Sequence, residues 1–559
     1  MVELLHHGGI VSAQDPPPST GSAARRWLGL VAIALGVALI VVDTTIVNVI
    51  VPSVIEDLDV NSAQAQWIQE SYAIVFAALL LLVGRFADLV GARRIFIAGV
   101  VLFGATSALA GLAPSGELLI AARFLQGAAG AMILPTSLSL LNATFTGKAR
   151  GQAFAVWGST IGAASALGPL LGGWLAEHSS WRWAFGINIP LSVLIAVGAV
   201  LYLAPSPRTK GRIDVIGAVL SVLSLGLLAF GLVEGRTYGW FATVRPLDLF
   251  GFHWDGGPSP VLVALALSVA SMFAFLTRQA ALTRSDDPSR ALMDVRLFRI
   301  ASFRNGNIAT LIIGLGEFGI VAVLPLWLQF TLDYSAVQAG LALVPIAIGS
   351  FVASGASFGL AARLGALAQL RTGLALEVAG LAGLGLIAAT DSPWWTVALV
   401  LFLYGIGVGF ATAQVTNVVL AEIPERSAGQ GSGIQSAFRQ LGSALGIAVL
   451  TTLFFTTLGT KLGDRLDGLG LPAAQADGLT HAVTDSAGAA IGTLAQNPQT
   501  AQAADAARWA MTEGITLGGY VAAGFLVLGL AASAFIPSAG VRTTTSAEET
   551  REVPVGGGR

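Results

Sequence analysis

The sequence contains no cysteine and few charged side chains. None of its 559 residues is Cys, and 11% are Asp, Glu, Lys or Arg, where a soluble globular protein carries about 25%. Without a thiol the chain can form no disulfide, no thiolate metal site and no cysteine nucleophile. The five histidines lack the spacing of metal ligands, so we expect no metal centre. So few charges cannot cover a surface that faces water.

The sequence also lacks the signals of two further classes of protein, nucleic-acid binders and ATP-binding proteins. The formal net charge of −2 argues against a nucleic-acid partner, because such proteins usually carry a basic face. Gly147-Lys148 is followed by Ala149 and lacks the preceding glycine of a phosphate-binding loop. We therefore expect no ATP site and no other cofactor. Any active process must then draw its energy from an ion gradient.

Apolar residues dominate the chain, at 54% of the total, and the mean hydropathy is +0.75. A helix needs about 20 apolar residues to cross a hydrocarbon core of roughly 30 Å. About fourteen apolar runs reach that length. They cover residues 28–50, 67–85, 94–112, 118–141, 152–175, 183–203, 213–233, 260–276, 308–330, 339–360, 366–389, 395–420, 434–458 and 515–536. The pattern predicts an all-α polytopic membrane protein.

Positive charge alternates along the joints between these runs. Lys and Arg occur at residues 25–26, 85–94, 148–150, 208–212, 278–304, 363–371, 426 and 542–559. Four of the alternate joints, 52–66, 113–117, 333–338 and 391–394, carry none. The exceptions on that side lie mostly in longer joints, where the rule is weaker: Arg182, Arg236, Arg245, Lys461, Arg465 and Arg508. Because Lys and Arg gather in short cytoplasmic joints, this alternation predicts an even number of helices and two cytoplasmic termini.

Two charged residues lie deep in the N-terminal runs. Asp43 is in the first run, where loss of hydration disfavours the charged form of a carboxylate. Asp43 could therefore exchange a proton near neutral pH, or it could be a structural link held by Thr44, Thr45 or Asn48. Arg123 in the fourth run needs an acidic or carbonyl partner at that depth. Asp43 is the obvious candidate.

Two more carboxylates lie in the C-terminal runs. Glu317 is surrounded by Gly314, Gly316 and Gly319, where another backbone or a cavity could approach. Glu377 has only apolar neighbours along the chain. Ionisable groups at membrane depth are functional candidates by default, but a structural role stays open for both.

A glycine-rich segment joins the second and third runs. It contains Gly84, Asp88, Gly91, Arg93 and Arg94, and its glycines permit a tight turn. Asp88 could cap the next helix, pair with an arginine of a neighbouring helix, or stay solvated in the loop.

Taken in order, these segments resemble the motifs of the major facilitator superfamily, in particular its fourteen-helix drug:proton antiporter branch. Residues 43–52 resemble the first-helix motif, 84–94 the loop signature and 118–130 the fourth-helix Arg motif. The run Gly168-Pro169-Leu-Leu-Gly172-Gly173 is similar to the antiporter motif, although a plain packing groove is the alternative. Residues 181–190 and 439–442 add further matches.

The resemblance implies two six-helix bundles built of inverted repeats, with two inserted helices and a central cavity between the bundles. We accordingly expect a disordered cytoplasmic tail at 1–26, bundles at 27–205 and 291–537, inserted helices at 206–290, and a second tail at 538–559. The stretch 459–513 is expected to be an external loop, with short amphipathic helices near 501–511.

The resemblance also implies roles for single residues, with Asp43 as the proton-coupling candidate and Arg123 as its partner. Glu317 matches no family motif and joins these proton-coupling candidates because of its depth in an apolar run. The cytoplasmic gate candidates are Gly84, Asp88, Gly91, Arg93 and Arg94. The antiporter motif comprises Gly168, Pro169, Gly172 and Gly173, and the substrate-cavity candidates are Asn48, Gln126, Glu317, Glu377 and Arg439.

The predicted function is therefore proton-coupled export of hydrophobic or cationic small molecules, which is transport and not catalysis. The expected partners are a small-molecule substrate, protons and the lipid of the cell membrane. Two alternatives stay open. The same fold could export a lipid, a siderophore or an endogenous metabolite, or the chain could be a receptor or scaffold that moves nothing.

Overall fold

The computed structural model describes residues 23–537, apart from 61, 207, 209–210, 250–251, 286–289, 361–363 and 425–426. The first helix, α1, begins at Ala23, so the predicted tail boundary at residue 26 is wrong by four residues. Alanine is the best helix former, and the stems of Arg25 and Arg26 can lie along apolar surface while their charges reach water. The rest of both predicted tails lies outside the described residues.

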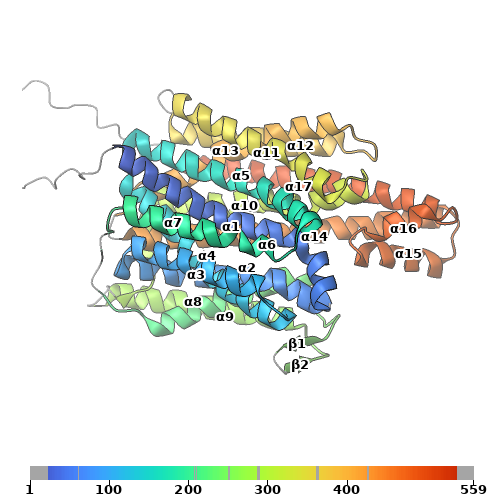
Figure 1. The fold of residues 1–559 in the computed structure, drawn as a ribbon, viewed down its shortest axis with the longest axis horizontal. Coiled ribbons are helices and arrows are strands. Elements are labelled where there is room, and N and C mark those ends of the chain that lie inside the picture. Colours follow the sequence, from blue (N-terminus) through green and yellow to red (C-terminus); the bar gives the residue numbers. More distant parts are fainter. Residues whose placement is uncertain are drawn as a thin grey trace, which may run out of the picture.

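The N-terminal helices are long and nearly continuous (Figure 1). They are α1 (Ala23–Leu58), α2 (Ser62–Val90), α3 (Ala92–Gly111), α4 (Gly116–Thr144), α5 (Gly147–His178), α6 (Trp183–Gly186) and α7 (Asn188–Tyr202). The expected turn between the second and third runs is shorter than predicted. Helix α2 runs through Gly84 and Asp88, and the chain turns at Gly91, whose φ of 106° favours glycine.

Two inserted helices follow, α8 (Val215–Tyr238) and α9 (Pro260–Arg284), along the lower edge of the view in Figure 1. An antiparallel hairpin of β1 (Leu247–Leu249) and β2 (Phe252–Trp254) joins their outer ends, with Asp248 opposite His253. At the other end the Arg278 guanidinium donates to both carboxylate oxygens of Asp214 at 2.7–2.9 Å. Burial opposes ionisation of Asp214, yet the bonds from Arg278 prevail and hold its pKa below the usual range.

The C-terminal part comprises η2 (Val295–Arg299), α10 (Ala301–Phe330), α11 (Ala336–Leu360), α12 (Ala366–Ile387), α13 (Trp394–Leu420), α14 (Ala428–Gly468), α15 (Ala473–Asp485), α16 (Ala490–Gln496) and α17 (Ala501–Ser533). The expected external loop is mostly helix, because α14 and α17 extend beyond the bilayer-length core (Figure 1). Residues 501–511 are the first turns of α17, not a separate short helix. Leu458, Leu462 and Leu466 continue one buried stripe of α14, and an apolar stripe of this period favours helix.

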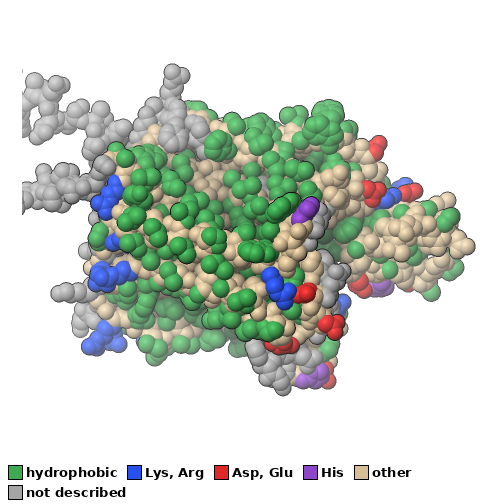
Figure 2. All heavy atoms as spheres, in the orientation of Figure 1, with side chains coloured by type: hydrophobic (Ala, Val, Ile, Leu, Met, Phe, Trp, Pro, Cys, Tyr) green, Lys and Arg blue, Asp and Glu red, His purple; other side chains and the backbone are tan. Residues whose placement is uncertain are grey.

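Among the described residues, twelve helices are long and apolar enough to cross a membrane. Helices α5 and α11, of 32 and 25 residues, also pack against the other helices of the chain, α5 against α1 and α11 against α13. The chain is thus a multi-pass helical membrane protein, and the total of fourteen spans stays a prediction. Figure 2 shows hydrophobic side chains over the flanks of the helices and Lys and Arg side chains gathered at the end where α1 begins.

Candidate functional site

A fully buried ion pair lies in the N-terminal helices. Asp43 of α1 has no exposed surface, and its Oδ2 lies 2.5 Å from Nη1 of Arg123 on α4. Gln126 of α4 and Asn188 of α7 each donate to the other carboxylate oxygen, Oδ1, at 2.8 Å. Both oxygens of the carboxylate are therefore occupied by donors, one of them cationic. Such bonds favour the ionised form and are stronger than bonds between neutral groups.

A second layer of contacts holds these groups in place. Ser107 of α3 accepts from Gln126 at 2.8 Å and from Asn188 at 3.2 Å. Arg123 donates through Nε to the carbonyl of Ile68 on α2 at 3.1 Å, and its guanidinium lies 4.5 Å from the centre of the Tyr72 ring. Five helices thus contribute to one hydrogen-bonded network, which matches the expectation that a deep arginine has acidic and carbonyl partners.

The sequence indicated Asp43, Arg123 and Gln126 but not Asn188, Ser107 or Tyr72. The helix breaks between α6 and α7, and Asn188 is the first residue of α7. An amide at the start of a new helix, two residues before Pro190 and within an apolar run, was the available signal. Ser107 had no comparable signal, because a serine at membrane depth more often bonds only to its own helix.

The predicted antiporter motif packs against the helix that carries Asp43. A Cβ atom at Gly168 would overlap Thr45 Oγ1, and one at Gly172 would lie 2.9 Å from Ile46 Cγ1. Only a residue without a side chain lets the α5 backbone approach α1 this closely. The side chains of Asn48, Pro169 and Gly173, which were also predicted to matter, lie outside the described residues.

The predicted gate segment contacts the C-terminal helices. The carboxylate of Asp88, near the end of α2, is buried and accepts from the backbone N–H groups of Gly429 and Gln430 at 2.7 and 2.9 Å. These groups open α14, so Asp88 caps a helix far away in the sequence and complements its dipole. Gly84 makes room for this crossing, because a Cβ there would lie 2.6 Å from the Gly429 carbonyl oxygen.

The arginines of the same segment face other neighbours. Arg93 donates from its backbone N–H to Ser206 Oγ at 3.0 Å and from Nη2 to the carbonyl of Val200 at 2.5 Å, while Arg94 is exposed. A second contact between the two parts of the chain joins α5 to α13, where Arg150 Nε donates to Asn417 Oδ1 at 3.1 Å. Both contacts join the two parts of the chain near the end where α1 begins.

Three of the predicted cavity candidates lie on the C-terminal helices. Glu317 on α10 and Glu377 on α12 are both buried, and the positive charge of Arg439 on α14 acts on both carboxyl groups. The Arg439 guanidinium lies 5.8 Å from the ring centre of Trp157 on α5 and 5.6 Å from that of Phe318. Arg439 therefore lies where an N-terminal helix meets the C-terminal helices.

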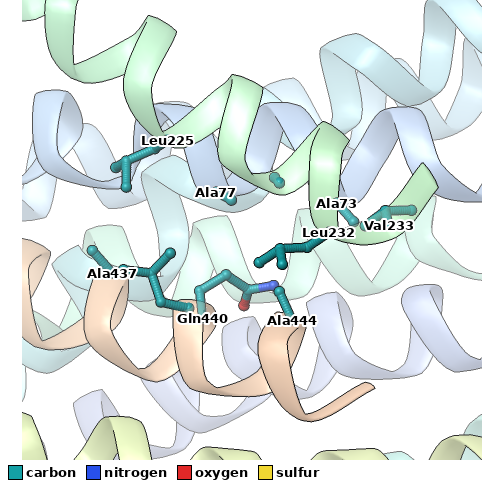
Figure 3. Close-up of a pocket in the computed structure, with 10 residues that line it drawn as sticks. Ala73, Ala77, Leu225, Leu232, Val233, Ala437, Gln440 and Ala444 are labelled. Carbon is teal, nitrogen blue, oxygen red and sulfur yellow. The ribbon is translucent and has the colours of Figure 1, made fainter. Parts of the chain in front are cut away.

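A small pocket of about 30 Å³ lies between α2, α8 and α14. Its lining is apolar apart from Gln440, and Figure 3 shows side chains of α8 and α14 facing one another across it. A drug-sized ligand fills roughly 300–1,000 Å³. This pocket is too small for such a ligand, and none of the predicted cavity residues lines it.

Comparisons with known proteins agree with this architecture. Residues 33–447 match the model of the Major Facilitator Superfamily. The chain is 34% identical over 496 residues to the puromycin resistance protein pur8 of Streptomyces alboniger, covering 86% of this chain and 91% of that protein. It is 30% identical over 528 residues to the multidrug efflux pump LfrA of Mycolicibacterium smegmatis, covering 93% and 97%.

Solved structures show the same fold at low sequence identity. The human organic anion transporter TETRAN aligns with a TM-score of 0.58 at 14% identity, covering 93% of this chain and 100% of that one. The proton:xylose symporter XylE aligns with a TM-score of 0.57 at 13% identity, covering 92% and 97%. The family match and these relatives show that the chain is a secondary transporter of the membrane and not an enzyme. The chain belongs to the major facilitator superfamily.

Proposed function

We propose that this protein exports hydrophobic, often cationic, small molecules across the cell membrane in exchange for protons. The names of the relatives, a puromycin resistance protein and a multidrug efflux pump, support the substrate class. One structural observation carries the coupling step: the fully buried pair of Asp43 and Arg123. Ionisable groups at this depth are expensive and mark ion pathways.

The network suggests how protonation changes the structure. Asp43 links α1 to Arg123 and Gln126 of α4 and to Asn188 of α7. A proton on Asp43 removes the negative charge that holds the Arg123 guanidinium, so the ion pair that joins α1 to α4 weakens. A proton from outside and an outgoing substrate then favour different states of this ion pair. Such differential affinity is what couples two ligands.

Opening towards the cytoplasm requires specific contacts to break. We propose that the cap from Asp88 to α14 and the bond from Arg150 to Asn417 are the inside gate. The two parts that rock are residues 27–205 and 291–537, with 206–290 as inserted helices. The arginine-rich end shown in Figure 2 supports a cytoplasmic location for both termini.

The test is transport by the full chain in proteoliposomes under an imposed pH gradient, with ethidium as a monovalent hydrophobic cation. We expect Asp43→Asn to abolish gradient-driven efflux while the protein stays folded, because an amide cannot carry the proton. The matched control is Asp57→Asn on the same helix, where Asp57 is 47% exposed and pairs with Arg182. This control should transport normally.

Full efflux by Asp43→Asn would remove Asp43 from the mechanism. A parallel panel of neutral lipophiles, including lipids, identifies the chemistry of the cargo. Binding of ethidium without any pH-dependent movement would indicate a receptor and refute export.

A further inference from the structure

The C-terminal helices hold more negative than positive charge at membrane depth. Glu377 is fully buried and Glu317 is 7% exposed. Among the charged groups that the structure describes, Arg439 is the cation that acts on both carboxyl groups. Two ionised carboxylates and one guanidinium carry a net charge of −1. In the N-terminal network, by contrast, Asp43 and Arg123 balance as they stand.

The hydrogen bonds of this C-terminal cluster leave acceptors in excess. Thr412 Oγ1 donates to Glu317 Oε1 at 3.2 Å. The hydroxyl of Tyr404 donates to the backbone carbonyl of Glu317 at 3.0 Å and not to a carboxyl group. Neither carboxyl oxygen of Glu377 has a hydrogen-bond partner among the described residues. A buried polar atom without a partner costs about 1–3 kcal/mol, and more when it is charged.

Within the part of the chain that the structure describes, the helices packed against Glu377 offer it no further charged group. On α13 the facing titratable group is Tyr404, and Gly407 lies so near that a Cβ there would be 2.6 Å from Cγ of Glu377. On α17, Tyr520 contacts Gly385, two turns away along α12. The remaining groups are Glu317 from α10 and Arg439 from α14.

Building on the proposed function, we propose that Glu317 and Glu377 form a second proton-binding site, in which the two carboxyl groups hold one proton beside Arg439. The negative charge of Glu317 acts on Glu377, and two like charges that act on one another in a low dielectric disfavour each other's ionisation. One proton gives the cluster a net charge of zero.

The location of Arg439 connects this site with transport. Its side chain is only partly buried and lies between Trp157 of α5 and Phe318 of α10. Any rocking of the N-terminal helices against the C-terminal helices changes the surroundings of Arg439. Moving that cation away from the carboxyl groups favours proton uptake, and returning it favours proton release. The second site therefore adds one proton to each transport cycle.

Infrared difference spectroscopy on the purified full-length protein at pH 7 tests the site directly. We expect the wild type to show a deuterium-sensitive carboxylic acid C=O band that both Glu377→Gln and Glu317→Gln remove, since each variant leaves one carboxylate balanced by Arg439. The double variant should remove no more intensity than either single one. The control is Glu422→Gln, because Glu422 is exposed and accepts from Ser302 Oγ at 2.8 Å. It should leave the band unchanged.

An unchanged band in both single variants, or additive losses in the double variant, would overturn the shared proton. Transport separates this inference from the proposed function. We expect the double variant Glu317→Gln/Glu377→Gln to export ethidium with one proton fewer per molecule, measured from the membrane potential that balances the pH gradient, because one remaining carboxyl group could still take up and release a proton as Arg439 moves. If the wild type shows no gradient-driven export, the proposed function fails whatever the spectra show. If export persists and the proton count of the double variant equals that of the wild type, the second site fails alone.

Discussion

The two buried ionic clusters of this transporter differ in how their charges and donors are matched. In the N-terminal helices one carboxylate meets one arginine, and three side chains donate to its two oxygens. In the C-terminal helices two carboxyl groups share one arginine, and Glu377 has no donor among the described residues. The first arrangement stabilises an ion pair, and the second favours uptake of a proton. Similar residue types in one protein can thus serve different tasks, because the number of donors decides which charge state is stable.

The largest expected effect comes from breaking the matched pair. Arg123→Gln leaves the Asp43 carboxylate buried without its cation, and removing one partner of a buried pair costs about 3–5 kcal/mol. We expect a loss of this size in the unfolding free energy of the detergent-solubilised protein, together with loss of ethidium export. A stability change below about 1 kcal/mol would contradict the ion pair and with it the contrast between the clusters.

A second, smaller effect concerns the C-terminal cluster and depends on pH. In Arg439→Gln the folded protein must bind a proton on each carboxyl group, whereas the unfolded chain binds neither near neutral pH. Because the folded state then binds one proton more than in the wild type, its stability falls as pH rises. Between pH 6 and 8 the fall should be about 1.4 kcal/mol per pH unit steeper than for the wild type.

The measurement is chemical unfolding of both proteins across this pH range. At pH 6 the matched variant Arg123→Gln should lose more unfolding free energy than Arg439→Gln does. The reason is that Asp43, the partner of Arg123, has no second carboxyl group with which to share a proton. Parallel stability curves for Arg439→Gln and the wild type would indicate that the two glutamates do not take up an extra proton.

The smallest effect is expected at the exposed outer end of α1, where Asp57 pairs with Arg182. The bonds from Arg182 and from the Trp181 indole N–H lower the pKa of Asp57. A carboxylate with a lowered folded pKa adds stability above its unfolded value near 4, and that stability is lost as pH falls through the folded pKa. Since both side chains are more than a third exposed, the gain is below about 1 kcal/mol.

Thermal unfolding of Asp57→Asn and the wild type between pH 3 and 7 checks this expectation. The small difference between the two proteins should be present at pH 7 and vanish towards pH 3. A difference as large as that of Arg123→Gln would show that exposure does not separate the two ion pairs of α1.

Local patterns predicted much of the site and not its surroundings. Asp43 and Arg123 were recognisable because a charge in an apolar run is rare and costly. Asn188 and Ser107 were not, since polar neutral residues are common in membrane helices and their partners lie on other helices. Glu317, Glu377 and Arg439 were each identified, but nothing local indicated that they act on one another. Asp88 was expected near the joint of α2 and α3, and its partner is the first turn of α14.

The sequence by itself determined that the chain is a bundle of membrane helices, where most of them lie, and which residues carry charge into the apolar interior. These properties depend on hydropathy and helix period, which are local to each segment. Only the tertiary structure decided that one carboxylate is fully matched with donors while two others compete for one arginine. It also decided that Asp88 closes the contact with α14. Such matches depend on distances between helices far apart in the chain, which packing sets and no single segment encodes.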